Sequence, residues 1–204
     1  MMGRCLGVLL PVALLLGGCG GDDEPAREPA RAQLLRVYDA KAEAPADLRL
    51  RIPIQKGWSG ASEKELELPI GGTIRKVDDS CELFLQLQAD NGDGPVRLPG
   101  TRQVERGTRT LELDGRKLKA GFRLYRAENG LRLGIGSTGA GGALLLTMRD
   151  ADTGNVVARL LALGGMDGLR CPFGPEEAIR RTFKVLRDMA QRTIVERVPQ
   201  RKRS

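Results

Sequence analysis

Apolar and polar side chains alternate over much of the middle of this chain. The alternation is clearest in residues 48–54, 66–70 and 81–87, where every second residue is Leu, Ile or Cys. Successive side chains of a β-strand point to opposite faces of a sheet, so a period of two predicts strands with one buried face. The pattern therefore predicts a fold built around a β-sheet.

Turn signals separate these segments from further strands. Asp114-Gly115 lies between residues 111–113 and 118–124 and is typical of a tight hairpin. Asn129-Gly130 marks a second turn before residues 131–135. The continuous apolar runs 143–148 and 156–163 flank another turn and are typical of buried central strands. Together these signals predict an antiparallel meander.

The period changes after Cys171. Pro175 with Glu176 and Glu177 predicts a helix start, because proline suits the first turn and acids suit the positive end of the helix dipole. Apolar residues then recur every three or four positions, at Ile179, Phe183, Leu186, Ala190 and Ile194. We therefore expect an α+β fold, an antiparallel β meander sheet with a C-terminal α-helix packed on one face.

The start of the chain has the layout of an export signal. Arg4 precedes an apolar segment, 6–16, that is shorter than the roughly 20 residues needed to span a bilayer. The apolar segment leads into Leu16-Gly17-Gly18-Cys19, which resembles the lipobox of bacterial lipoproteins. That resemblance implies cleavage before Cys19 and lipidation of its sulfur, including palmitate. The alternative is a plain signal peptide with an incidental cysteine.

The resemblance also implies a location. Two or three acyl chains on Cys19 would hold the protein on a membrane without any spanning helix. Gly20 follows the cysteine where the enterobacterial sorting rule reads an aspartate as a retention signal. We therefore expect an outer-membrane lipoprotein that faces the periplasm.

Composition predicts how the chain is divided. We expect a signal peptide over residues 1–18 and a lipidated cysteine with a flexible tether over 19–46, which begins rich in Gly, Pro, Ala and charge. A short helix could begin in the tether near Pro29 and dock through Leu34, Leu35 and Tyr38. A single α+β domain is expected over 47–198, followed by a basic tail over 199–204.

Cysteine counting follows from export. With Cys5 removed and Cys19 lipidated, Cys81 and Cys171 remain as a pair in an oxidising compartment, and we predict that they form a disulfide. Closing this loop would stabilise the fold by about 4 kcal/mol in the chain-entropy model. The alternative is two free thiols or a redox pair, although no CxxC spacing is present.

Positive charge is concentrated near the C-terminus. The formal net charge is +7, and residues 175–204 hold nine basic and four acidic side chains. Arg180, Lys184 and Arg187 share one face of the predicted helix, as candidates for binding anionic lipid headgroups or an acidic protein. The alternative is a solvated helix face. Nucleic acid is not expected as a partner, because aromatic residues for stacking are scarce and the compartment is wrong.

The sequence carries no recognisable catalytic set. It has no histidine, which excludes Ser-His-Asp and Cys-His catalysis and the usual imidazole metal sites. The glycine-rich segment 134–142 lacks the Gly-Lys-Ser/Thr of a phosphate loop, and residues 90–94 read as a turn, since a calcium loop would need acids at later positions. We therefore expect no enzyme, no metal and no cofactor.

Trp58 is the only tryptophan and follows a strand that ends Pro53-Ile54. A strand ending in proline and followed by Gly-Trp is similar to exported proteins of the PsbP type, small α+β binding or assembly factors. Trp58 is either a core plug at a strand end or an anchor for a partner.

These observations favour a non-catalytic binding or interaction module of the cell envelope, anchored by lipid and holding a protein partner or an anionic envelope component. The alternative is an immunity lipoprotein that neutralises a secreted toxin. A hydrolase is the less favoured hypothesis, since it would need two carboxylates facing each other across a cleft.

Overall fold

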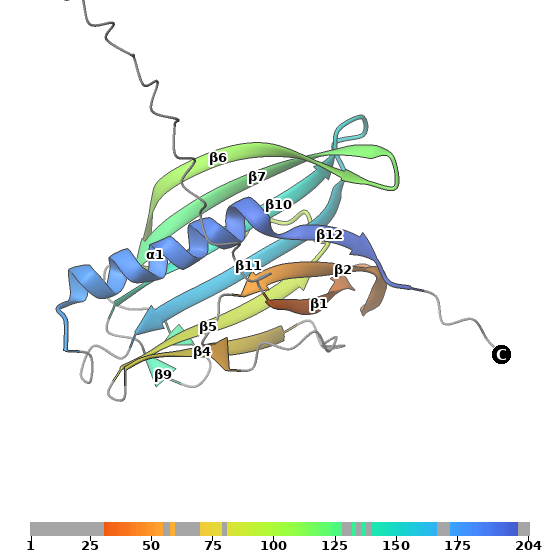
Figure 1. Ribbon diagram of the computed structural model, residues 1–204. Helices are drawn as coiled ribbons and strands as arrows, with labels where there is room; N and C mark the ends of the chain where they lie inside the picture. The colour runs from red at the N-terminus through yellow and green to blue at the C-terminus, as the bar shows by residue number, and fades with distance from the viewer. Residues whose placement is uncertain are drawn as a thin grey trace, which may run out of the picture.

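The protein is mostly β-sheet with one C-terminal helix (Figure 1). The computed structural model describes residues 31–54, 58–59, 70–78, 81–127, 132–133, 136–137, 140–166 and 172–199. The strands of its large, curled sheet are β1 (Arg31–Asp39), β2 (Ala44–Ile54), β3 (Trp58–Ser59), β4 (Ile70–Asp78), β5 (Cys81–Asp90), β6 (Thr101–Leu113), β7 (Arg116–Ala127), β10 (Ala140–Asp150), β11 (Val156–Met166) and β12 (Ile194–Arg197). A separate small pair consists of β8 (Arg132–Leu133) and β9 (Gly136–Ser137), and the helix is α1 (Pro175–Arg192).

The strand order departs from the meander that the sequence predicts. It runs β12-β2-β1-β5-β11-β10-β7-β6, and β4 joins β3 to β5 beside this path. One edge of β5 pairs with β11, while its other edge is divided between antiparallel β4 and a parallel contact with β1 at Tyr38 and Asp90. The sheet is therefore mixed, because β5 pairs in parallel with β1 and antiparallel with β4 and β11, and it does not pair with β6.

Residues 31–46 belong to the folded sheet and are not a tether. They form β1 and the start of β2, and Leu35 and Val37 of β1 are fully buried. The expected helix around Leu34, Leu35 and Tyr38 is therefore wrong. Adjacent Leu34 and Leu35 are both buried, which is the pattern of a strand covered on both faces. Residues 19–30, the first part of the expected tether, lie outside the described residues.

Several other strand predictions are confirmed. Residues 48–54, 81–87, 143–148 and 156–163 lie within β2, β5, β10 and β11. Asp114 and Gly115 form the hairpin turn between β6 and β7, and both have positive φ, +52° and +77°. Such a turn matches the twist of the flanking strands. Residues 66–69 and the Asn129-Gly130 turn lie outside the described part of the chain.

Helix α1 begins where the sequence predicts, with Pro175 in its first turn and two acids beside it. Its buried residues include Phe183, Leu186 and Ala190, and it packs on β10, β11, β2 and β7. The helix ends at Arg192, and the N–H of Thr193 donates to the carbonyl of Met189. Ile194 is therefore not part of the helical stripe; it starts β12, which pairs with β2, and is 39% exposed.

The sheet has one face toward α1 and one face away from it. A side chain at Gly142 of β10 would collide with the ring of Phe183 on the helix, so this position faces α1. Side chains alternate along a strand, and Leu144, Leu146 and Met148 accordingly share the buried, helix-facing side. The intervening residues of β10 point to the opposite side, here called the outer face.

The connection from β5 to β6 crosses the outer face. Three strands, β11, β10 and β7, separate β5 from β6 in the sheet, so residues 91–100 must pass over them. Leu98 of this crossing connection packs with Ala127, Ala143 and their neighbours on the outer face. The N–H and hydroxyl of Thr101 both donate to the carbonyl of Leu98, which fixes the end of the connection.

Polar contacts join the edge strand β6 to the C-terminal part of the helix and the residue after it. The guanidinium of Arg109 on β6 donates to the carbonyl of Thr193, and burial lowers the pKa of Arg109. Arg187 of α1 forms an ion pair with Glu105 of β6 at 2.7 Å. These contacts hold β6 close to the end of the helix and help to curl the sheet around it.

Candidate functional site

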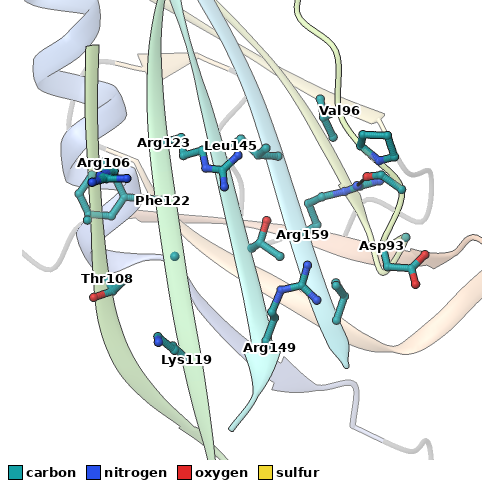
Figure 2. Close-up of a pocket in the computed structure, with 17 residues that line it drawn as sticks. Asp93, Val96, Arg106, Thr108, Lys119, Phe122, Arg123, Leu145, Arg149 and Arg159 are labelled. Carbon is teal, nitrogen blue, oxygen red and sulfur yellow. Dashed lines mark hydrogen bonds between the residues drawn. The ribbon is translucent and has the colours of Figure 1, made fainter. Parts of the chain in front are cut away.

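A groove lies between the outer face of the sheet and the crossing connection (Figure 2). Its volume is about 780 Å³. Strands β6, β7, β10 and β11 form the floor, and residues 92–96 of the crossing connection form one wall. This size lies within the range of small-molecule sites, which are about 300–1,000 Å³.

The floor carries three rows of side chains set by the strand register. At one end, Arg106 of β6 pairs with Arg123 of β7, and Arg123 pairs with Leu145 of β10. Arg106 and Arg123 are exposed. The first row therefore places two arginines at directly paired backbone positions on the outer face (Figure 2).

The opposite end of the groove repeats this arrangement with different strands. Lys119 of β7 pairs with Arg149 of β10, and Arg149 pairs with Val156 of β11. A bulge between Met148 and Arg149 interrupts the register of β10 against β11 and brings Val156 to the outer face. Lys119 and Arg149 are both exposed cations at this end (Figure 2).

The middle row is small and polar. Gly121 of β7 lies between Thr108 of β6 and Thr147 of β10, which are its direct partners in the two ladders. A Cβ built at Gly121 would meet no atom within 4 Å. The centre of the groove is therefore open above Gly121 and flanked by two hydroxyl groups.

Arg159 of β11 supports the wall of the groove. Its guanidinium pairs with the carboxylate of Asp90 at 2.8 Å and donates to the carbonyl of Gly94 at 2.7 Å. Only 15% of the Arg159 side chain and 13% of the Asp90 side chain are exposed. The guanidinium of Arg159 is occupied by these contacts and so is not free to bind a ligand.

The other four groove cations have no carboxylate partner. Arg106, Lys119, Arg123 and Arg149 form no ion pair with any residue that the structure describes. Arg149 donates to the carbonyl of Gly154 at 3.0 Å. Among the residues that line the groove, Asp93 is the one carboxylate, and it is exposed on the crossing connection.

Eight arginines elsewhere in the described fold form ion pairs with acids, whereas others, such as Arg97 and Arg116, do not. The pairs are Arg49 and Arg51 with Glu196, Arg126 with Glu176, Arg180 and Arg181 with Glu177, Arg187 with Glu105, Arg192 with Asp188 and Arg197 with Asp114. The four groove cations lack such acid partners. Like charges directly opposite each other on neighbouring strands are destabilising. Chemically, the groove offers fixed positive charge and hydroxyl donors, an arrangement suited to binding an anion.

The structure gives less support to a binding site at the helix residues Arg180, Lys184 and Arg187. Arg180 pairs with Glu177, and the two arginines that bind Glu177 lower its pKa. Arg187 pairs with Glu105, so of these three helix residues Lys184 alone is an exposed cation without an ion pair to a described residue. The basic helix face is thus largely neutralised.

Two further sequence predictions are only partly covered by the structure. Trp58 lies in β3, where it pairs with Arg75 of β4, but its side chain lies outside the described residues. Cys81 begins β5, is 1% exposed, and its Sγ lies 4.0 Å from the Sδ of Met166. Cys171, Cys19 and residues 200–204 of the basic tail are outside the described part of the chain, so the disulfide and the lipidation stay predictions.

The described residues contain no cluster of three or more potential metal ligands and no helix long and apolar enough to span a membrane. No family model matches the sequence, and no curated protein matches it.

Proposed function

We propose that this protein is a lipid-anchored binding module of the bacterial cell envelope that holds an anionic envelope component in the groove. The observation that carries the binding role is the set of four cations, Arg106, Lys119, Arg123 and Arg149, that have no carboxylate partner among the described residues. Arginine and lysine side chains carry positive charge and only donate hydrogen bonds, so these groups suit an anion. Binding is therefore favoured over catalysis.

The anchoring part of the proposal is supported by the sequence. Leu16-Gly17-Gly18-Cys19 follows a short apolar segment and resembles a lipobox. Lipid on Cys19 would place the folded sheet, which begins by Arg31, a short distance from the membrane. Gly20 favours the outer membrane, with the domain in the periplasm.

Binding is tested with short-chain polyphosphate and the purified full-length protein. We expect binding that weakens as salt is added, because exposed charges are screened over about 10 Å at 0.1 M salt. The double variant Arg106→Gln/Lys119→Gln should lose most of this affinity. The matched control, Arg180→Gln/Lys184→Gln, removes the same charge from the helix and should keep it. Equal losses in the two variants would contradict a site in the groove.

Anchoring is tested by labelling cells with radioactive palmitate and separating their membranes. Cys19→Ala should abolish the label and release the protein from membranes, because the acylated sulfur is lost. Cys5→Ala is the matched control, since it lies in the segment expected to be removed, and it should keep the label. Palmitate on the Cys19→Ala variant would refute the anchor.

A further inference from the structure

The arrangement of the groove identifies a narrower class of ligand. We propose that the groove binds a bisphosphorylated saccharide, laid along β7 with one phosphate on each pair of cations and the sugar above Gly121. This inference rests on the proposed function, in which the groove holds an anion.

Each end of the groove carries two positive charges, enough to balance one phosphate group. Arg106 and Arg123 are direct partners at one end, and Lys119 and Arg149 are direct partners at the other. A phosphate ester carries about −1.5 to −2 charges near pH 7 and offers three acceptor oxygens, whereas a carboxylate carries one charge. Two adjacent cations therefore match a phosphate better than a carboxylate.

The two pairs are too far apart to share a single phosphate. Lys119 and Arg123 are four residues apart on β7, which separates their backbone positions by about 13 Å at 3.3 Å per residue. Their side chains rise from the same face of the strand. A ligand that uses both pairs must carry an anionic group at each end.

The middle of the groove suits a hydroxylated spacer. Thr108 and Thr147 flank Gly121 and supply two hydroxyl groups that can donate and accept hydrogen bonds. The absence of a side chain at Gly121 leaves room for a ring above the sheet. Pro95, Val96 and Val156 line the groove and offer apolar surface to the C–H groups of a sugar.

The ligand class is tested by calorimetric titration of the full-length protein. The probes are glucose bisphosphate, glucose monophosphate, and the bisphosphates of ethylene glycol and hexanediol. We expect glucose bisphosphate to bind about 100-fold more tightly than the monophosphate, because the second phosphate binds intramolecularly. The ethylene glycol compound should bind like a monophosphate and hexanediol bisphosphate should fall between the two glucose esters. Equal affinity of the glucose mono- and bisphosphate would overturn the proposal.

Removing either cation pair tests whether the two ends act together. Arg106→Gln/Arg123→Gln and Lys119→Gln/Arg149→Gln should each reduce the affinity for glucose bisphosphate to that for the monophosphate. In the variant that lacks all four cations, the ratio of bisphosphate to monophosphate affinity should fall little further. Additive losses, in which each pair contributes independently of the other, would show two separate anion sites and refute a bridging ligand.

Gly121→Val provides a test that leaves every charge in place. Valine suits a strand, and its first carbon would meet no atom within 4 Å, so the variant should fold. It should block the spacer, reducing glucose bisphosphate binding by at least tenfold while monophosphate binding is retained. Thr108→Val/Thr147→Val should remove the advantage of glucose over hexanediol bisphosphate. Unchanged bisphosphate binding in Gly121→Val would contradict the proposed position.

The source of the saccharide is tested by competition. Phosphatidylcholine vesicles that contain a bisphosphorylated glycolipid should displace glucose bisphosphate if the natural ligand is a lipid headgroup, and should not if it is soluble. Either result agrees with the ligand class. If polyphosphate binds but the glucose mono- and bisphosphate do not differ, only this inference fails; if polyphosphate does not bind, the proposed function fails with it.

Discussion

Arg159 of β11 and Asp90 of β5 form an ion pair that is 2.8 Å long and mostly shielded from water. Another nitrogen of the same guanidinium donates to the carbonyl of Gly94, so Arg159 joins two strands to the crossing connection. Removing it would leave a shielded carboxylate and a carbonyl without their main partner. The wall of the groove therefore depends on one residue of the sheet.

We expect Arg159→Met to lower the free energy of unfolding by about 2–3 kcal/mol, because breaking a shielded pair leaves a charge unpaired. The double variant Asp90→Asn/Arg159→Met should recover part of this loss. Arg192→Met is the control: it breaks an exposed pair with Asp188 and should cost less than about 0.5 kcal/mol. Urea denaturation measures all three. Equal losses at residues 159 and 192 would contradict the structural role of Arg159.

The cation pairs of the groove should reduce the stability of the free protein. Arg123→Gln should raise the free energy of unfolding by about 0.2–1 kcal/mol at low salt, because Arg106 lies directly opposite. The gain should disappear near 1 M salt, where screening is strong. Arg187→Gln breaks the pair with Glu105 and should show the opposite sign. A loss of stability in Arg123→Gln would mean that the pair is neutralised.

Helix docking depends on the missing side chain at Gly142. An added Cβ would lie 2.8 Å from the ring of Phe183 and 3.1 Å from the carbonyl of Tyr125, and the backbone carbonyl cannot turn aside. Gly142→Ala should therefore cost about 1–3 kcal/mol of stability, as overpacked cores do. The control Gly121→Ala adds the same atom in open space on β7 and should be neutral or slightly stabilising. Thermal unfolding of both variants decides the point.

The turn between β10 and β11 should make stability depend on pH. Asp150 accepts hydrogen bonds from the N–H groups of Asp152 and Thr153 and from the Thr153 hydroxyl, and these bonds, those of Thr153 foremost, lower its pKa below 3.8. A lowered folded-state pKa contributes stability above the unfolded value, and that contribution is lost as the pH falls through the folded value.

The variant Asp150→Ala should therefore be less stable than the wild type by a constant amount from neutral pH down to about pH 4. The difference should shrink at lower pH. Denaturation series across this range measure it, and Asp152→Ala, which keeps the backbone N–H that donates to Asp150, is the control. A difference that grows as the pH falls would contradict the assigned hydrogen bonds.

The predicted disulfide can be checked with a thiol-reactive probe. Cys81 is 1% exposed at the start of β5, and a bond to Cys171 would link this strand to the segment that leads into α1. We expect both cysteines to be unreactive in the unfolded, unreduced protein. Reduction should release two thiols and lower stability by about 2–5 kcal/mol. Full reactivity before reduction would exclude the bond.

Local signals determined much of the secondary structure. The helix start at Pro175 and the hairpin at Asp114-Gly115 depend on neighbours in the sequence, and both are where they were expected. Ile194 continued the helical spacing but pairs with Arg51 of β2, a partner more than 140 residues away. The adjacent apolar residues Leu34 and Leu35 suggested a docking helix, because no local signal indicates that β1 is covered on both faces.

The groove could not be predicted for a related reason. Arg106, Lys119 and Arg149 each occupy the polar side of an ordinary strand, where a cation usually reflects contact with water. Their significance comes from the ladder register and from the missing carboxylates, which are properties of the assembled sheet. The alternation along each strand correctly predicted which residues are on its polar face. Which cations become neighbours depends on the strand order.

The pairing of β12 with β2 constrains how the chain reaches its native state. β2 precedes β12 in the chain by most of the fold, and an exported chain crosses the membrane from its N-terminus, so the outer edge of β2 has no neighbour until β12 arrives. An exposed strand edge recruits other chains. That edge is therefore open to other chains until β12 pairs with it, and truncations before Ile194 should aggregate instead of folding.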